Sequence, residues 1–275
     1  MVSLDQYGVQ HIFPLKPNGT FLHLGTRAPN QSPHFFIERN TRAHERRTGA
    51  FKYWRLGSHP LNYASGGSGY TTRLHLYASG GSQQYTWRNQ KHGFLSSNKD
   101  VRNQEFTVYA RSGKFKDPRR ASFSLKIRGG KHSGDWASCT QMGFGPGGKG
   151  FRSEVTFAKE LTHPKYDTIR LTPRCAANLI EGAWYGLKVV SYSVGTAASK
   201  VVKNRLYIDT DPINFTTGKL KNNWQLLAEY VDVPGKSTGH YSKLVDWGGW
   251  QTTFRTDGLE YVDFALVSVV EISPP

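Results

Sequence analysis

The sequence predicts an all-β protein, a single sandwich of two antiparallel sheets over residues 1–275, with residues 1–50 as a less regular N-terminal wrap. Three observations predict this class. Apolar and polar residues alternate in short runs, as in a strand with one buried face. The 29 Gly and 13 Pro residues separate these runs, and helical periodicity is nearly absent. Neither a Ser/Pro-rich linker nor a repeat of fixed period divides the chain.

Eight runs are the expected strands. In order, they cover residues 71–79, 105–113, 121–130, 150–160, 183–194, 204–211, 223–233 and 261–272. Turn sequences such as SGK, GGK, GPGGKG and PGKSTG fall between several of them. Because the side chains of a strand point alternately to its two faces, each run also predicts a register.

The register sends the apolar set of each strand inward. This set contains Leu74, Leu76, Phe106, Val108, Ala110, Phe123, Leu125, Ile127, Val155 and Phe157. The opposite set repeatedly combines Arg or Lys with Tyr or His, and consists of Arg73, His75, Tyr77, Tyr109, Arg111, Lys126, Arg128, Arg152, Glu154, Lys188 and Tyr192. If the five strands are neighbours in one sheet, these side chains form a concave basic groove with aromatic platforms, which suits a long anionic polymer.

Composition narrows the class of protein and its partners. The 275 residues carry 36 Lys and Arg against 20 Asp and Glu, a formal net charge of +16. Hydrophobic residues make up 37% and aromatic residues 13%, which is ample material for a buried core. No apolar stretch approaches the ~18 residues of a membrane span, and residues 1–13 lack the regions of a signal peptide. Cys139 and Cys175 show no metal-ligand spacing, and a disulfide and two free thiols both stay open.

Several motifs resemble those of known β-sandwich families. FRSEVTF at 151–157 resembles the Arg-Ser/Thr-Glu-Leu/Val strand of the alginate-lyase-like jelly-roll polysaccharide lyases, whose Arg and Glu lie on the concave face. GGKH, which ends at His132, and GAWYGLKVVSY at 182–192 give further similarity to concanavalin-like sandwiches. NKDVRNQEFTVYA, IRGGKH and FAKELTHPKY are also similar to a group of uncharacterised archaeal and metagenomic sandwich proteins. The lyases' Gln-Ile/Val-His and Tyr-Phe-Lys-Ala-Gly strands have no ordered counterpart in this chain.

The resemblance implies a concanavalin-like β-jelly roll and a polysaccharide lyase that cleaves an anionic, uronate-containing polysaccharide by β-elimination. We expect Arg128 and Arg152 to neutralise the C5 carboxylate, because a guanidinium can bind it through two hydrogen bonds. His132 is the expected base, with His75 as its competitor, and Tyr192 or Tyr109 is the expected acid. The expected substrate-binding residues are Arg73, His75, Tyr77, Arg111, Lys126, Glu154 and Lys188.

Other functions stay open at this point. A non-catalytic, lectin-like carbohydrate-binding protein would use aromatic side chains, with Trp247, Trp250 and Arg255 in a candidate loop. A glycoside hydrolase would need two facing carboxylates, such as Glu154 and Glu105. The absence of a recognised nucleic-acid-binding motif in the sequence argues against nucleic acid as the partner.

Cofactor and location complete the expectations. We expect no required cofactor and no catalytic metal. The sequence DTDPIN, with Asp209 and Asp211, leaves a structural calcium ion open. We expect an extracellular or cell-surface protein, and the lack of a signal peptide in residues 1–13 leaves secretion open.

Overall fold

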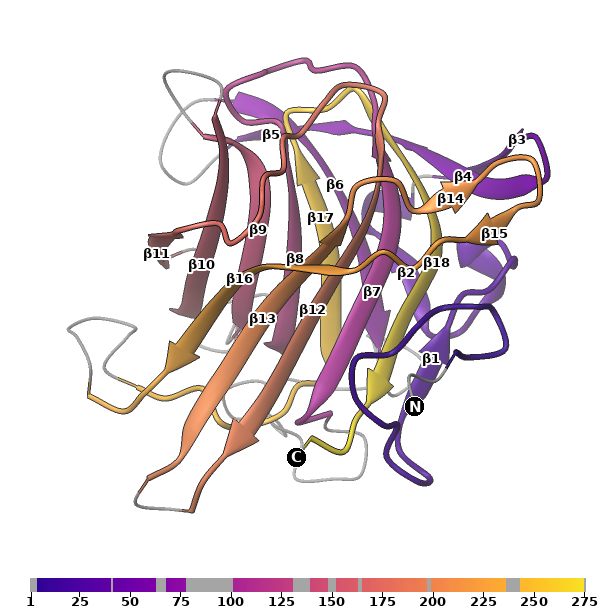
Figure 1. The fold of residues 1–275 in the computed structure, drawn as a ribbon. Helices are drawn as coiled ribbons and strands as arrows, with labels where there is room; N and C mark the ends of the chain where they lie inside the picture. The colour runs from indigo at the N-terminus through magenta and orange to yellow at the C-terminus, as the bar shows by residue number, and fades with distance from the viewer. Residues whose placement is uncertain are drawn as a thin grey trace.

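Two antiparallel sheets pack face to face in the computed structural model of the chain (Figure 1). The structure describes residues 4–40, 42–62, 68–77, 101–130, 139–147, 152–162, 165–196, 199–235 and 243–274. In Figure 1, strands β16, β13, β12 and β7 of one sheet lie in front of β11, β10, β9 and β8 of the other. The predicted class, an all-β jelly roll of two antiparallel sheets, is confirmed.

We call the front sheet in Figure 1 sheet I. Its strands follow the spatial order β16 (Gln225–Asp232), β13 (Val201–Asp209), β12 (Trp184–Val194), β7 (Gln104–Ser112), β18 (Tyr261–Glu271), β4 (Phe51–Gly57) and β3 (His44–Thr48), and β1 (Phe21–His23) also pairs with β18. A separate hairpin joins β14 (Ile213–Asn214) to β15 (Lys219–Leu220).

Sheet II lies behind sheet I. Its strands follow the order β11 (Lys165–Leu171), β10 (Arg152–Thr162), β9 (Cys139–Gly147), β8 (Ser122–Gly129), β17 (Gln251–Asp257), β6 (Ser68–Tyr77) and β2 (Phe35–Ile37), and β5 (His59–Asn62) also pairs with β6. Two short 3-10 helices, η1 (Pro29–Gln31) and η2 (Glu38–Asn40), flank β2.

The core lies between the two sheets. Every residue of the predicted inward set is buried there, from Leu74 on β6 to Phe157 on β10, so the predicted registers are confirmed. Gly258 makes the tight connection from β17 to β18, with a φ of +69°. A Cβ at this position would lie 2.6 Å from the backbone nitrogen of Ala121, so the turn requires glycine.

The N-terminal segment covers part of the outer face of sheet I. Val9 packs in a cluster with Tyr53 and Tyr109, and Phe13 packs edge-on against Tyr192, with ring centroids 5.1 Å apart. Val9 and Phe13 therefore cover part of this face, and later segments of the first 50 residues supply β1, β2 and β3 to the sheets. Among the described residues, no helix is long and apolar enough to cross a membrane.

Candidate functional site on the outer face of sheet II

The residues predicted to form one groove lie on two opposite faces of the sandwich. Strands β6, β8 and β10 belong to sheet II, whereas β7 and β12 belong to sheet I. The inner faces of the sheets are buried against each other, so the outward side chains of the two groups point in opposite directions. The expectation of a single groove from all five strands is therefore wrong.

A row of polar residues crosses the outer face of sheet II. His75 on β6 is paired with Thr253 on β17, and Thr253 is paired with Lys126 on β8. The next partner of Lys126 is Gln141 on β9. Adjacent strands lie about 5 Å apart, so this row places an imidazole, a hydroxyl, an ammonium and an amide side by side.

Lys126 connects this row to the two strands beyond β9. Its Nζ donates a hydrogen bond to the phenol oxygen of Tyr166 on β11 and lies 3.5 Å from Oε2 of Glu160 on β10. Lys126 and Glu160 are buried, whereas Tyr166 is half-buried. The Lys126 ammonium is therefore in direct contact with a phenol that is partly open to solvent.

The environment of His75 keeps its ring neutral. Burial lowers the pKa of His75 to about 4; the Glu38 carboxylate opposes this shift, while Arg73 and Lys126 add to it. Nδ1 lies 2.8 Å from Oγ1 of Thr253 and 3.0 Å from Nε2 of Gln251. Because the Gln251 amide nitrogen can only donate and the Thr253 hydroxyl can also donate, Nδ1 accepts, and the proton of the neutral ring is assigned to Nε2. His75 is therefore suited to donate a hydrogen bond to a ligand, and not to act as the base.

Aromatic rings flank His75. Phe36 is 37% exposed, and its ring centroid lies 6.2 Å from that of His75. Tyr77 lies 6.1 Å from His75 on the same strand and stacks on Trp250 at 5.5 Å. Trp250 is buried. Trp250 is therefore a packed tryptophan and not part of the exposed lectin-like loop that the sequence left open, and the partly exposed Phe36 ring lies beside the row.

Charged residues on this face are paired with opposite charges. Arg73 lies 2.6 Å from Glu38. Glu154 lies 3.2 Å from Arg170 on β11. Arg255 donates two hydrogen bonds to Asp257, at 2.7 and 2.8 Å. The face therefore carries both signs of charge, whereas the sequence predicts a basic groove.

Arg128 does not reach the outer face. Its side chain is fully buried, with Nε donating to Ser191 Oγ at 2.8 Å and Nη1 donating to the carbonyl oxygen of Trp247 at 2.7 Å. The alternation is interrupted here, because Arg128 has a φ of +57° and the pairing of β17 with β8 shifts between Gln251 and Thr253. The expected outward position of Arg128 is wrong.

Tyr109 and Tyr192, the two expected acids, are buried on the outer face of sheet I. Burial raises the pKa of Tyr109 well above its usual value, and the Asp209 carboxylate adds to the increase. Burial also raises the pKa of Tyr192, although Arg205 opposes the shift. Burial therefore disfavours ionisation of both phenols.

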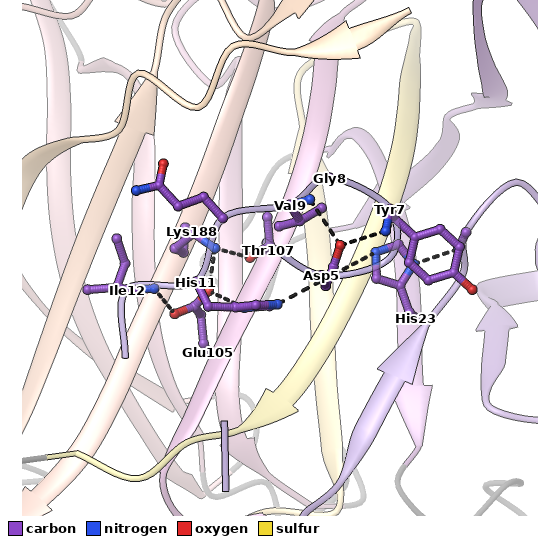
Figure 2. Close-up of polar contacts among 12 residues, drawn as sticks. Asp5, Tyr7, Gly8, Val9, His11, Ile12, His23, Glu105, Thr107 and Lys188 are labelled. Carbon is purple, nitrogen blue, oxygen red and sulfur yellow. Dashed lines mark hydrogen bonds and ion pairs between the residues drawn. The ribbon is translucent and has the colours of Figure 1, made fainter. Parts of the chain in front are cut away.

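Lys188 belongs to a buried network under the N-terminal segment (Figure 2). Its ammonium donates to Glu105, and to Thr107 Oγ1 at 2.7 Å. Figure 2 shows His11 between Glu105 and Asp5, with Nδ1 2.8 Å from Glu105 and Nε2 3.4 Å from Asp5. The expected exposure of Lys188 is wrong, because residues 5–12 seal this part of β12.

Two further expectations concern sheet I. Arg111 is on its outer face, where its guanidinium pairs with Asp263. Glu105, the suggested hydrolase partner of Glu154, is fully buried in the network on this sheet. Since Glu154 is on the outer face of the other sheet, the two carboxylates cannot face one glycosidic bond, and that suggested pair is wrong.

Some expected residues cannot be placed, and others were missed. His132 lies outside the described residues, as does the side chain of Arg152 on β10. The missed residues are Gln141 and Thr253, and also Tyr166, because β9, β17 and β11 are not among the eight expected strands. The alternation in QMGF and TIRL is a weak signal for two of these strands.

Metal-binding groups and thiols add little to this site. Among the described residues, no group of three or more His, Cys, Asp or Glu side chains could hold a metal ion. Asp209 accepts hydrogen bonds from the backbone N–H groups of Asp211 and Asn223, at 3.0 and 2.8 Å. Cys175 is a free thiol.

Comparisons with known proteins give structural similarity only. No family model matches the chain, and no curated protein matches it in sequence. The VIP36 exoplasmic/lumenal domain, in a Ca2+/Man3GlcNAc-bound form, is 11% identical, with a TM-score of 0.47 over 92% of this chain and 89% of that chain. The exolytic PL7 alginate lyase from Zobellia galactanivorans is 7% identical, with a TM-score of 0.46 over 92% and 100% of the two chains. Lectin I-B4 from Griffonia simplicifolia is 7% identical, with a TM-score of 0.39 over 90% and 98%.

Proposed function

We propose that the outer face of sheet II binds a uronate-containing polysaccharide and cleaves it by β-elimination. The observation that supports this proposal is the hydrogen bond from the Lys126 ammonium to the half-buried Tyr166 phenol. His75 and Gln141 lie in the same cross-strand row as Lys126. The row therefore combines a group that moves a proton with donors for a carboxylate.

Tyr166 carries the proton in this proposal. Its phenolate, stabilised by Lys126, takes the proton from C5 of the uronate. The electron pair of the broken C5–H bond forms the C4=C5 double bond, and the C4–O4 bond breaks. Tyr166 then returns the proton to O4, so the phenolate is regenerated and no further reactant is needed.

His75 and Gln141 neutralise the substrate carboxylate. Removal of the C5 proton places negative charge on the carboxylate, and donors aimed at this charge lower the barrier. His75 offers its Nε2–H. The Gln141 amide donates one N–H to Ser124 Oγ at 3.2 Å, and a primary amide has a second N–H for a ligand. These two residues take the role that the sequence assigned to Arg128 and Arg152.

The test is the ultraviolet absorbance of the unsaturated product on incubation with alginate, glucuronan, pectate, hyaluronan and heparin. We expect Tyr166→Phe to lower kcat by about a hundredfold or more and to leave polymer binding nearly unchanged. Tyr70→Phe is the control, because the Tyr70 ring also lies beside an ammonium, 5.2 Å from Lys116 Nζ. Full turnover by Tyr166→Phe would remove Tyr166 from the mechanism, and no product from any polymer would refute cleavage.

Binding without cleavage is the second candidate. It is supported by the exposed Phe36 ring beside the neutral His75, because an aromatic face and an uncharged donor suit a sugar ring. We expect Phe36→Ala to weaken retardation of the protein in gels that contain the polymer. Phe21→Ala is the matched control, since Phe21 is 39% and Phe36 37% exposed and Phe21 lies on β1 of sheet I. Equal retardation of both variants would discard Phe36 as a sugar platform.

A further inference from the structure

Two arginines on the outer face of sheet I share one buried carboxylate. The pairing of β4, β18 and β7 places Arg55 opposite Asp263, and Asp263 opposite Arg111. Arg55 donates from Nε to Oδ1 at 2.8 Å and from Nη2 to Oδ2 at 3.0 Å. Arg111 donates from Nε to Oδ2 at 2.8 Å, and its Nη2 donates to the same oxygen. Asp263 is thus saturated by two guanidinium groups.

The cluster carries one uncompensated positive charge. Asp263 is fully buried, whereas the side chains of Arg55 and Arg111 are 30% and 22% exposed. Two guanidinium groups and one carboxylate sum to a charge of about +1 at neutral pH. On sheet II, by contrast, Arg255 has the carboxylate of Asp257 as its own partner.

Aromatic rings hold both guanidinium groups in place. The guanidinium of Arg55 lies 3.9 Å from the ring centroid of Tyr261. That of Arg111 lies 5.4 Å from Tyr53 and 5.7 Å from Trp184, and its Nη2 donates to the Tyr53 hydroxyl at 3.3 Å. Because stacking and hydrogen bonds fix their orientation, a ligand would not have to order these side chains on binding.

Each arginine keeps one terminal nitrogen for a ligand. Among the described residues, none accepts a hydrogen bond from Nη1 of Arg55 or Nη1 of Arg111. Neither atom is among the buried polar atoms that lack a partner, so both reach solvent. Guanidinium N–H groups that are oriented and charged are strong donors to oxyanions.

We propose that Arg55 and Arg111 form a binding site for one oxyanion, the carboxylate or sulfate group of an acidic glycan. The site goes beyond the function proposed above, because it lies on the opposite face of the sandwich from Tyr166 and takes no part in cleavage. Asp263 orients the two arginines, and their Nη1 groups bind the anion. A polymer held on sheet I would raise the local concentration of chains that reach sheet II.

The experiment follows arginine side-chain resonances by NMR in the wild-type protein. Sodium sulfate and sodium glucuronate are added in separate titrations, so the two arms distinguish a sulfated from a carboxylated glycan. We expect the Nε–Hε signals of Arg55 and Arg111 to shift together and to saturate with at least one of the anions. Arg119, whose side chain is 80% exposed, reports non-specific screening. Shifts at Arg55 and Arg111 that are as weak and linear as those at Arg119 would overturn the proposal.

Variants separate this site from the proposed active site. Arg55→Lys and Arg111→Lys keep a cation beside Asp263 but remove the guanidinium group whose Nη1 contacts the anion. The anion whose titration saturates in the wild-type protein should therefore bind about tenfold more weakly to each variant. Arg119→Gln should leave the affinity unchanged. In a fixed concentration of a short uronate oligosaccharide, Arg55→Lys should retain cleavage, and Tyr166→Phe should retain the titration. Unchanged anion affinity in both lysine variants would contradict the assignment, whatever the outcome of the cleavage assay.

Discussion

The outer faces of the two sheets contain similar residues but use them differently. On sheet I, Lys188 and Glu105 are buried together with His11 under the N-terminal segment. On sheet II, Lys126 and Glu160 are also buried, but Lys126 contacts the half-buried Tyr166. A network whose partners all lie inside the protein holds a segment in place. In the function proposed above, the buried cation beside a partly exposed phenol acts on a bound molecule, so access to solvent separates the two roles.

The network on sheet I balances its charges internally. Asp5 and Glu105 supply two carboxylates, and Lys188 and a protonated His11 supply two cations. Burial lowers the pKa of His11, but the hydrogen bonds to Asp5 and Glu105 outweigh this effect and raise it. His23, the fifth titratable member, has its pKa lowered to about 4 by burial. The network is therefore neutral when His11 is charged and His23 is not.

The largest expected effect comes from breaking this network. Lys188→Met removes the cation beside Glu105 and leaves a buried carboxylate with less compensation, which should lower the free energy of unfolding by about 3–5 kcal/mol. Urea denaturation measures the change. Lys16→Met is the matched control, because the exposed Lys16 pairs with Glu271 at 2.7 Å, and loss of such a pair costs about 1 kcal/mol or less. Equal costs for the two variants would mean that the network does not hold the segment.

A smaller effect on the free energy of unfolding is expected below neutral pH, where one histidine on each sheet becomes protonated. Burial lowers the pKa of His23 and of His75 to about 4 from an ordinary value of 6.5. Each contribution to stability is therefore complete above pH 6.5 and is lost as the pH falls towards 4, by up to about 3 kcal/mol. The free energy of unfolding between pH 4 and 7 should depend less on pH in His23→Gln and in His75→Gln. Only the second variant should also weaken polymer binding.

The pH dependence of stability above neutrality tests the role of His11. This residue faces Asp5, Glu105, Lys188 and His23. Its pKa is raised in the folded protein, so its contribution is complete below pH 6.5 and is lost as the pH rises through the folded pKa. The free energy of unfolding should therefore fall by at most about 1.4 kcal/mol per pH unit because of His11. His11→Gln should flatten this limb in unfolding measurements, while the acid limb from His75 persists. An unchanged alkaline limb would assign it to another group.

The smallest effect is expected at the edge of sheet II. Arg170→Gln removes the partner of Glu154, but Arg170 is exposed, so the free energy of unfolding should change by about 1 kcal/mol or less. Cleavage of the polysaccharide should also persist, because Arg170 takes no part in the proposed proton transfer. A large loss of turnover with normal stability would instead extend the site along β10 and β11 to Glu154.

The candidate site was only partly predictable from the sequence. His75 and Lys126 follow from alternation along their own strands, and both lie on the expected outward face. Tyr166 and Gln141 come from strands with only two clear apolar residues each, a signal too short to separate from a loop. Their contact with Lys126 depends on the order β11-β10-β9-β8, and strand order is set by non-local pairing.

The sequence by itself determined the fold class, eight of the strands and the inward set, because a strand buried on one face must alternate its side chains. Only the tertiary structure decided which outward faces meet solvent. The alternation predicts that the side chains of Lys188 and Tyr109 point away from the core, but it gives no information about the N-terminal segment that covers them. The alternation also does not predict the positive φ of Arg128, which turns this side chain inward. Burial of these side chains depends on contacts with segments far apart in the chain, and the residue pattern within one strand cannot predict such contacts.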